Sequence, residues 1–403
     1  MTSESVSTTL TAEEVGQPEG ASTHEGMETG QVLTIVGGHF IHDVYTAFVA
    51  PLLPLIIEKL SLSLTLAGSL TAVLQLPGLL NPFIGYLADK VSLRYFVILA
   101  PAVTATLISS MGFAPSYFSL ATILFVTGIS VAAFHAPAPA MIAEISGKKV
   151  GLGMSLFMAG GELGRTVGPL LAVWAVSTWT LNGFYRIVVL GWAASLVLYI
   201  RLKNISARPA RNGSARAVLP FLKTLFLPLM LITLFRNFMM ASLSVYLPTF
   251  MSREGASLLA AGSALSIYEL AGVAGALTSG TLSDRLGRKF VLLAASLSSA
   301  AVMLVFLNLH GWMQAAVLLA LGFTNLSTTP VLLAIVQEHL PNNRAVGNGL
   351  YMSINFLMQL VTILGVGLLG DYYGLRNAFF WSAILSLLAI PAILALPAVR
   401  EQG

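Results

Sequence analysis

Five acidic or arginine side chains lie well inside long apolar segments of the sequence, and they are the first candidates for chemistry. They are Asp43, Glu162, Arg165, Arg236 and Glu269, and a sixth, Glu144, lies near the end of such a segment. A charged group at the centre of a bilayer costs at least about 2.5–3.5 kcal/mol, so each needs a cavity, a partner or a function. Burial favours the protonated form of a carboxylate, whereas a nearby cation favours the ionised form, so such an acid can exchange a proton for a bound solute.

The acids and the arginines suit different roles. We predict that Asp43 and Glu269 carry the proton, with Glu162 as a third candidate. Arg165 and Arg236 would hold an anionic group, because a guanidinium matches the geometry of carboxylates and phosphonates. The alternative is that Glu162 and Arg165, three residues apart, form only a satisfied pair within one helix.

Other polar side chains accompany these charges in the apolar segments. His39 and Asp43 are four residues apart and share a helix face, whereas His42 points about a third of a turn away. The predicted substrate-binding residues are His39, His42, Gln75, His135, Arg165, Arg236, Asn237, Tyr268, Asn325 and Gln359. The alternative for His39 and His135 is that they bond only backbone carbonyl oxygens.

The composition shows what kind of element must hold these residues. Charged residues are 9% of the 403 and hydrophobic residues 56%, so the charges are too few to coat a water-facing surface. The apolar runs are long enough to span a bilayer and lack the alternation of a β-barrel. We predict an all-α membrane protein with twelve transmembrane helices. Their approximate ranges are 33–57, 62–88, 94–112, 116–143, 150–174, 184–202, 221–250, 257–282, 290–308, 312–338, 346–369 and 376–398.

The placement of charge predicts the orientation and the domains. Residues 1–30 hold six of the 17 acidic residues and no Lys or Arg, which predicts a disordered acidic tail. Fifteen of the 21 Lys and Arg fall in one set of loops and four in the opposite set. Because basic loops stay on the cytoplasmic side of a membrane, we predict that both termini lie in the cytoplasm. We expect the chain to span the inner or plasma membrane. The predicted domains are the tail 1–30, a six-helix half 31–202, a cytoplasmic linker 203–220, a second half 221–399 and a cytoplasmic end 400–403.

The two predicted halves repeat. A shift of 194 residues pairs Pro54 with Pro248, Gly68 with Gly262, Glu144 with Glu338 and Gly153 with Gly347. Internal repeats of helices are typical of secondary transporters, whose substrate site lies between the repeats. The same shift pairs His42 with Arg236, Asp43 with Asn237, Gln75 with Glu269 and Arg165 with Gln359. Polarity is kept in these pairs and charge is not, which we interpret as the asymmetry of a binding site.

One motif carries a family resemblance. The segment GTLSDRLGRK at Gly280–Lys289 resembles the loop signature of the major facilitator superfamily, and a degraded copy, GYLADKVSLR, stands at Gly85–Arg94. The resemblance implies two pseudo-symmetric six-helix halves and a cytoplasmic gate. The predicted gate residues are Gly85, Asp89, Lys90, Arg94, Gly280, Asp284, Arg285, Gly287, Arg288 and Lys289. The alternative is that these charges only set the topology.

Within the superfamily the chain is most similar to the fosmidomycin-resistance proteins. The similar segments are Gly38–Asp43, Val131–His135 and Gly160–Pro169, although Ala136 separates His135 from the proline that usually follows it in that family. Leu124 occupies the place of an arginine that many drug exporters carry. Small residues also predict close helix contacts: Gly160, Gly164 and Gly168 form a stripe before Pro169, and we expect Gly272 and Gly275 to offer a matching small face on the eighth helix.

These observations predict a secondary active transporter that works by alternating access. We expect proton-coupled efflux of small drug-like or anionic compounds; the alternatives are a symporter that imports an organic anion and a transporter-like sensor. The sequence contains no P-loop and no protease or esterase motif, so we predict neither ATP-driven transport nor an enzyme. Because the sequence contains no cysteine, it has no thiolate metal site. We predict no cofactor, no metal and no nucleic-acid partner. We expect the chain to be a monomer in a lipid bilayer.

Overall fold

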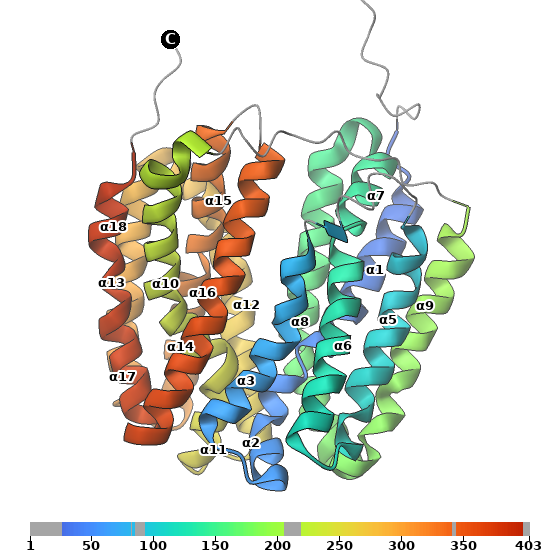
Figure 1. Cartoon of the computed structure of the whole chain (residues 1–403), viewed down its shortest axis with the longest axis horizontal. Coiled ribbons are helices and arrows are strands. Elements are labelled where there is room, and N and C mark those ends of the chain that lie inside the picture. Colours follow the sequence, from blue (N-terminus) through green and yellow to red (C-terminus); the bar gives the residue numbers. More distant parts are fainter. Residues whose placement is uncertain (1–25, 82, 85–92, 205–218, 341–343, 398–403) are drawn as a thin grey trace, which may run out of the picture.

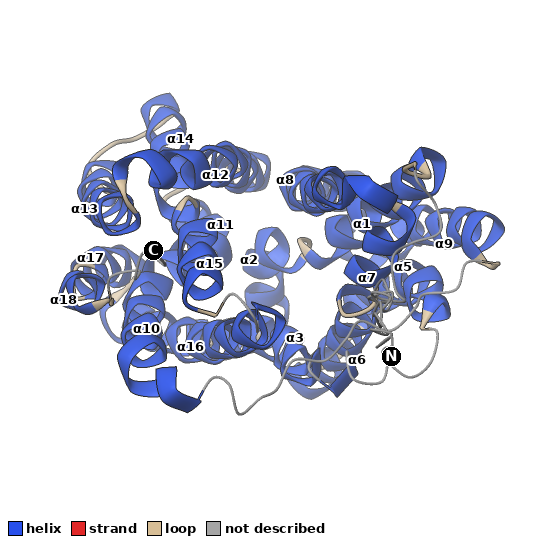
Figure 2. Cartoon of the chain, turned by 90° about the horizontal axis from the view of Figure 1, so that it is seen from above, coloured by secondary structure: helices blue, strands red, loops and turns tan. Residues whose placement is uncertain are grey.

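The computed structural model describes residues 26–81, 83–84, 93–204, 219–340 and 344–397, and these are built from helices joined by short loops (Figure 2). The first group of helices is α1 (Thr29–Thr46), α2 (Val49–Leu60), α3 (Leu64–Gln75), α5 (Arg94–Ser109), α6 (Tyr117–His135), α7 (Ala138–Ile145), α8 (Val150–Gly183) and α9 (Val189–Leu202). The second group is α10 (Leu227–Ala241), α11 (Leu247–Arg253), α12 (Leu258–Leu286), α13 (Arg288–Phe306), α14 (Trp312–Leu326), α15 (Thr328–His339), α16 (Arg344–Tyr373), α17 (Leu375–Ser386) and α18 (Ala389–Ala395).

The described residues contain ten helical stretches that are long and apolar enough to cross a membrane, and one shorter apolar stretch at Leu64–Leu80. The stretch Gly147–Leu202 is 56 residues long and includes both α8 and α9. Counting it as two spans gives eleven, and the shorter stretch Leu64–Leu80 matches the remaining one of the twelve predicted transmembrane segments. The prediction of an all-α membrane protein is therefore confirmed, and this chain is a multi-pass membrane protein.

Several spans consist of two consecutive helices. Pro137 lies between the end of α6 and the start of α7, and a π-helical turn at Ser242–Tyr246 separates α10 from α11. Proline cannot donate the backbone hydrogen bond that would continue a helix, which accounts for the first break. The second break lies just beyond Arg236 and Asn237, so irregular backbone is placed beside two of the polar residues predicted for the site.

The helices gather into two groups along the chain. In Figure 1, α5, α6 and α9 lie on one side, and α13, α17 and α18 lie on the other. Helix α8 packs on α12, and α3 packs on α16, so these two pairs join the groups. The predicted linker 203–220 and the tail 1–30 fall mostly outside the described residues, so the domain boundaries stay a prediction.

Glycine contacts repeat at the spacing found in the sequence. A Cβ added to Gly128 on α6 would lie 2.2 Å from the carbonyl oxygen of Leu74, and one added to Gly322 on α14 would lie 2.1 Å from that of Tyr268. Both residues of the second contact are 194 positions beyond those of the first. Gly68 of the first half lies against Ile363 of the second, and Gly262 of the second half lies against Pro169 of the first. Gly262 is 194 residues after Gly68, and Ile363 is 194 residues after Pro169. Equivalent helices therefore pack through equivalent glycines.

These contacts lead to a stability prediction. We expect Gly128→Ala and Gly322→Ala each to lower the free energy of unfolding by about 1–3 kcal/mol, because the added methyl group would overlap a backbone oxygen that cannot rotate away. Thermal unfolding in detergent measures the effect. Gly349→Ala is the control, since nothing lies within 4 Å of a Cβ at that helical position. Equal melting temperatures for all three variants would contradict the packing.

The predicted packing glycines lie at helix contacts, but with different partners. Gly160, Gly164 and Gly168 of α8 face Val36, Phe40 and Val44 of α1. Gly272 and Gly275 of α12 face Leu326 and Phe323 of α14. The prediction that these two small faces match each other is therefore wrong: α8 does pack on α12, but through Gly262 against Val173 and Pro169.

The end of the molecule away from the termini holds a contact between the two groups. Asp371, near the end of α16, accepts hydrogen bonds from the backbone nitrogens of Leu64 and Thr65 at 2.7 and 2.9 Å and from the Thr65 hydroxyl at 2.6 Å. Its carboxylate thus caps the N-terminus of α3, where the helix dipole favours negative charge. Nearby, the Tyr246 hydroxyl bonds the carbonyl oxygens of Leu64 and Ile363. These bonds hold the two groups together at this end.

Candidate functional site

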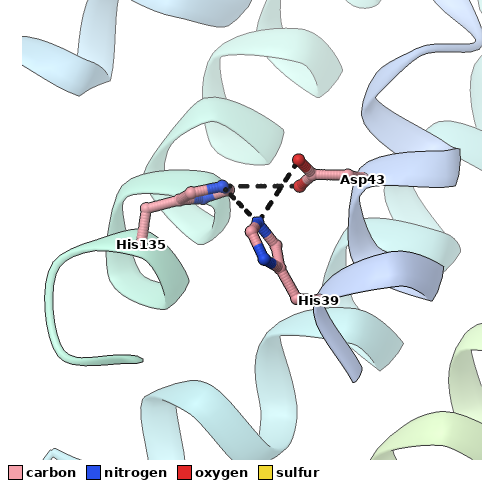
Figure 3. A group of neighbouring side chains, drawn as sticks. All are labelled: His39, Asp43 and His135. Atoms are coloured by element: carbon pink, nitrogen blue, oxygen red, sulfur yellow. Dashed lines mark hydrogen bonds and ion pairs between the residues drawn. The ribbon is translucent and has the colours of Figure 1, made fainter. Parts of the chain in front are cut away.

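Three histidines surround one buried carboxylate at the start of the chain. Asp43 of α1 lies 3.4 Å from His39 Nε2, 3.1 Å from His42 Nδ1 and 3.4 Å from His135 Nε2, the last of these at the end of α6 (Figure 3). The Nε2 atoms of His39 and His135 are 3.2 Å apart. The predicted shared face of His39 and Asp43 is confirmed. His42 also reaches Asp43, although the helical spacing predicted that it would point away.

Backbone and aromatic contacts fix the orientation of these rings. His39 Nδ1 bonds the Phe157 carbonyl oxygen at 2.8 Å, and His135 Nδ1 bonds that of Val131 at 3.0 Å. The His39 ring stacks on Phe157, and the His42 ring stacks on Phe134. The alternative interpretation of His39 and His135, a bond to backbone carbonyl oxygens, thus holds for one nitrogen of each ring, while the other nitrogen faces Asp43.

Gly161 of α8 makes room for this cluster. A Cβ at this position would lie 2.6 Å from His39 Nε2 and 3.0 Å from Asp43 Oδ2. In the second half, the position equivalent to Gly161 is Asn355, 194 residues later. The side-chain oxygen of Asn355 accepts a hydrogen bond at 3.3 Å from Asn237, the counterpart of Asp43. Sequence reasoning assigned no role to Gly161, and the adjacent glycines at 160 and 161 were the only signal.

Two further predicted residues lie on α8 and pair with each other. The Arg165 guanidinium contacts the Glu162 carboxylate, so the predicted intrahelical pair is present. Arg165 also interacts electrostatically with Asp43 and with Glu269 of α12. Its side chain is 46% exposed. Because a charged group facing lipid would be costly, this exposure indicates that Arg165 faces the space between the two groups of helices.

Glu269 lies in the middle of α12 and has a neutral partner. It is 9% exposed, and its Oε1 accepts a hydrogen bond from the Ser244 hydroxyl at 3.2 Å. Among the described residues no cation lies within ion-pair distance of it, although it interacts electrostatically with Arg165 and Glu162. Beside it, buried Tyr268 accepts a hydrogen bond from the Asn325 amide at 2.7 Å.

Arg236 is the buried cation of the second half. Its Nη2 donates to the Thr329 hydroxyl at 2.6 Å, and its Nε is buried without a hydrogen-bond partner in the described part of the chain. Arg236 is 6% exposed and forms no ion pair with a described carboxylate. The Oε1 atom of Gln75 is also buried without a described partner, and Gln359 is half-buried on α16. The structure thus brings His39, His42 and His135 together around Asp43. Among the described residues, the side-chain hydrogen-bond partners of Arg236 and Glu269 are neutral hydroxyl groups.

The predicted gate residues are described only in part. Gly85, Asp89 and Lys90 lie outside the described residues, and Arg94 begins α5. In the second copy, Arg288 pairs with Asp284 at 2.5 Å and with Glu338 of α15 at 2.7 Å.

The rest of the second copy connects other helix ends. Lys289 donates to the Leu394 carbonyl oxygen near the end of α18. Gly287 has a φ of +91°, which a residue with a side chain adopts only under strain, while Gly280 and Arg285 lie in the last turns of α12. These contacts lie within one group of helices, and opening and closing of a gate stays a prediction.

The sequence and the fold both match known membrane transporters. The chain is 28% identical over 387 residues to the fosmidomycin resistance protein of Escherichia coli strain K12, covering 93% of this chain and 94% of the relative. It is 26% identical over 341 residues to the probable 4-methylmuconolactone transporter of Cupriavidus pinatubonensis, covering 78% of each. The first of these relatives carries the name of the family that the sequence segments resembled.

Solved structures agree with this placement at the level of the fold. A bacterial homologue of the human lysosomal transporter Spinster, in an inward-facing and occupied conformation, superposes with a TM-score of 0.79 at 16% identity, covering 92% of this chain and 97% of the other. A D-xylose–proton symporter gives 0.77 at 15% identity, with 92% and 98% covered. The sequence model of the Major Facilitator Superfamily matches residues 35–362 and 229–402, and the chain therefore belongs to this superfamily of transporters.

Proposed function

We propose that this transporter exports small drug-like or anionic compounds in exchange for protons. Its membership of the superfamily supports alternating access, in which two groups of helices rock about a central site. The similarity to a fosmidomycin resistance protein supports efflux of an anionic compound. The transport cycle needs an acid that binds a proton in one state and a cationic group that holds the solute.

Glu269 carries the proposal. It is a buried carboxylate in the middle of a membrane-spanning helix, and its described hydrogen-bond partner is a neutral hydroxyl group. A permanently charged, unpaired carboxylate would be costly there, so the site favours an acid that takes up and releases a proton. Asp43 and Glu162 were also predicted for this role, but each has described basic partners, so the coupling role falls to Glu269.

Two arginines support an anionic substrate. Arg165 faces the space between the groups of helices, and Arg236 has a buried Nε without a described partner. A guanidinium presents several donors in one plane, which suits a phosphonate or a carboxylate. Binding of the anion near Arg165 would change the electrostatic environment of Glu269, because these two side chains already interact. Proton binding at Glu269 and anion binding near Arg165 are therefore linked.

A tolerance screen tests the efflux proposal. Cells with and without the protein are compared across a panel of phosphonates, organic acids and neutral drugs. We expect higher tolerance to anionic compounds in cells that contain the protein. Greater sensitivity to those compounds would instead favour the importing symporter, which the similarity to a probable 4-methylmuconolactone transporter keeps open. No difference for any compound, together with no transport by purified protein, would favour a sensor.

The orientation and the oligomeric state belong to the same proposal. The basic loops favour both termini in the cytoplasm of the inner or plasma membrane, with the chain working as a monomer. In that orientation the bonds from Asp371 to α3 lie at the external end. They would close the external side when the site faces the cytoplasm.

Removing this external contact should shift the transporter toward the outward-open state. We expect Asp371→Ala to raise external access about fivefold, because a helix cap contributes about 1 kcal/mol. The chain has no cysteine, so Ser244→Cys, next to Glu269, provides a single thiol whose reaction with an impermeant reagent reports access. Glu254→Gln is the control, since Glu254 pairs with Arg376 within one group of helices. Equal rates with and without Asp371 would contradict its role as an external latch.

A further inference from the structure

The donor atoms at the centre of the histidine cluster have the composition of a metal site. His39, Asp43 and His135 each offer one ligand atom, and these atoms all lie within 4.8 Å of one another (Figure 3). Imidazole nitrogens together with one carboxylate suit zinc and similar transition metals, whereas magnesium and calcium prefer oxygen ligands. We propose that His39, Asp43 and His135 bind a divalent transition-metal ion of the zinc class.

The distances between the donor atoms fit one ion. The two Nε2 atoms are 3.2 Å apart, and that of His39 lies 3.4 Å from Asp43 Oδ2 while that of His135 lies 3.4 Å from Asp43 Oδ1. A tetrahedral zinc ion with bonds of about 2.0–2.1 Å has ligand atoms about 3.3–3.4 Å apart. The two nitrogens therefore already have nearly the spacing of two zinc ligands, and each faces one oxygen of the same carboxylate.

The groups behind the ligands orient them toward the ion. The Nδ1 atoms of His39 and His135 are each held by a backbone carbonyl oxygen, of Phe157 and Val131. A ring that donates from Nδ1 presents the lone pair of Nε2, and metal-binding histidines are usually held in this way. In this tautomer two lone pairs would face each other at 3.2 Å, so a cation between them is needed for a favourable contact. His42 also contacts Asp43, with its Nδ1 3.1 Å from Oδ1, the oxygen that His135 faces.

The site is open on one side. The side chains of His39 and Asp43 are 5% and 9% exposed, but that of His135 is 32% exposed. Three protein ligands and one open position are typical of zinc sites that bind water or substrate. Two neutral imidazoles and one carboxylate carry a single negative charge, so a bound divalent ion would leave the site positive. An anionic oxygen of a substrate is then a suitable fourth ligand.

Metal binding can be measured without transport. The full chain is purified in detergent without a polyhistidine tag, treated with a chelator and titrated with Zn²⁺ in a calorimeter. We expect one Zn²⁺ per chain, and we expect Co²⁺ at the same site to give the visible absorption of a tetrahedral ion. His135→Gln and Asp43→Asn should each weaken binding at least about tenfold, the lower end of the loss seen when even an outer partner of a metal ligand is removed.

A matched histidine serves as the control. His339 also lies at a helix end, and its Nδ1 bonds the carbonyl oxygen four residues earlier, at Ile335, as that of His135 does at Val131. His339→Gln should therefore leave the Zn²⁺ affinity unchanged. Wild-type protein that binds no Zn²⁺, or that binds it equally well without His135 and Asp43, would overturn the proposal. In that case a shared proton holds the two Nε2 atoms together. The result is independent of the proposed proton coupling at Glu269, which is tested by transport.

Discussion

Glu269→Gln is expected to abolish transport that is driven by a pH gradient, reducing it to the level of liposomes without protein. The glutamine keeps the size of the side chain and can still accept from Ser244, but it cannot release a proton. Exchange of labelled for unlabelled substrate across the membrane needs no net proton movement, so it should continue. The measurement compares both activities for the same preparation of reconstituted protein.

The comparison separates coupling from folding. Glu58→Gln makes the same chemical change at an exposed position near the end of α2, and it should leave both activities at the wild-type level. If Glu269→Gln still concentrates substrate in response to a pH gradient, Glu269 is not the coupling residue. Loss of exchange as well as of gradient-driven transport would place Glu269 in substrate binding or in folding.

Asp43→Asn is expected to have a comparably large effect for a different reason. Asp43 is the one carboxylate among three imidazoles, and the change replaces one of its oxygens by an amide that donates hydrogen bonds. We expect transport to fall to background while substrate binding stays detectable, because Arg165 and Arg236 remain in place. We also expect the free energy of unfolding to fall by about 1–3 kcal/mol, since buried polar groups lose their partner.

Two measurements check this variant. Equilibrium binding of substrate reports whether the site persists, and thermal unfolding in detergent reports the loss of stability. Gly161→Ala provides an independent disturbance of the same cluster, because its methyl group would displace His39 and Asp43 without removing either side chain. It should also impair transport. Normal transport by both variants would show that the cluster has no part in the mechanism.

Much of the fold follows from the sequence because two signals are strong. The scarcity of charge and the length of the apolar runs require helices in lipid, and the segment at Gly280–Lys289 resembles one superfamily motif. The repeat of 194 residues reappears in the contacts of Gly128 with Leu74 and of Gly322 with Tyr268. Periodicity and repeats carry this information without knowledge of the neighbouring helices.

The partners of individual residues could not be predicted in the same way. The stripe of Gly160, Gly164 and Gly168 showed that some helix approaches closely, but a small surface does not specify which one, and it packs on α1. His42 contacts Asp43 because a side chain can reach sideways along the helix surface, which spacing alone does not describe. The role of Asp371 could not be predicted, because a carboxylate near a helix end is common in sequences. Only the structure shows that its partner is the N-terminus of α3.

The most direct test of proton-coupled export uses purified protein in liposomes with an imposed pH gradient and a labelled phosphonate or other anion. We expect the compound to move against its own gradient in the direction opposite to the protons, and we expect Glu269→Gln to abolish this movement. Movement of the compound in the same direction as the protons would contradict export and indicate a symporter. No movement with any compound that raises tolerance in cells would contradict proton-coupled transport itself.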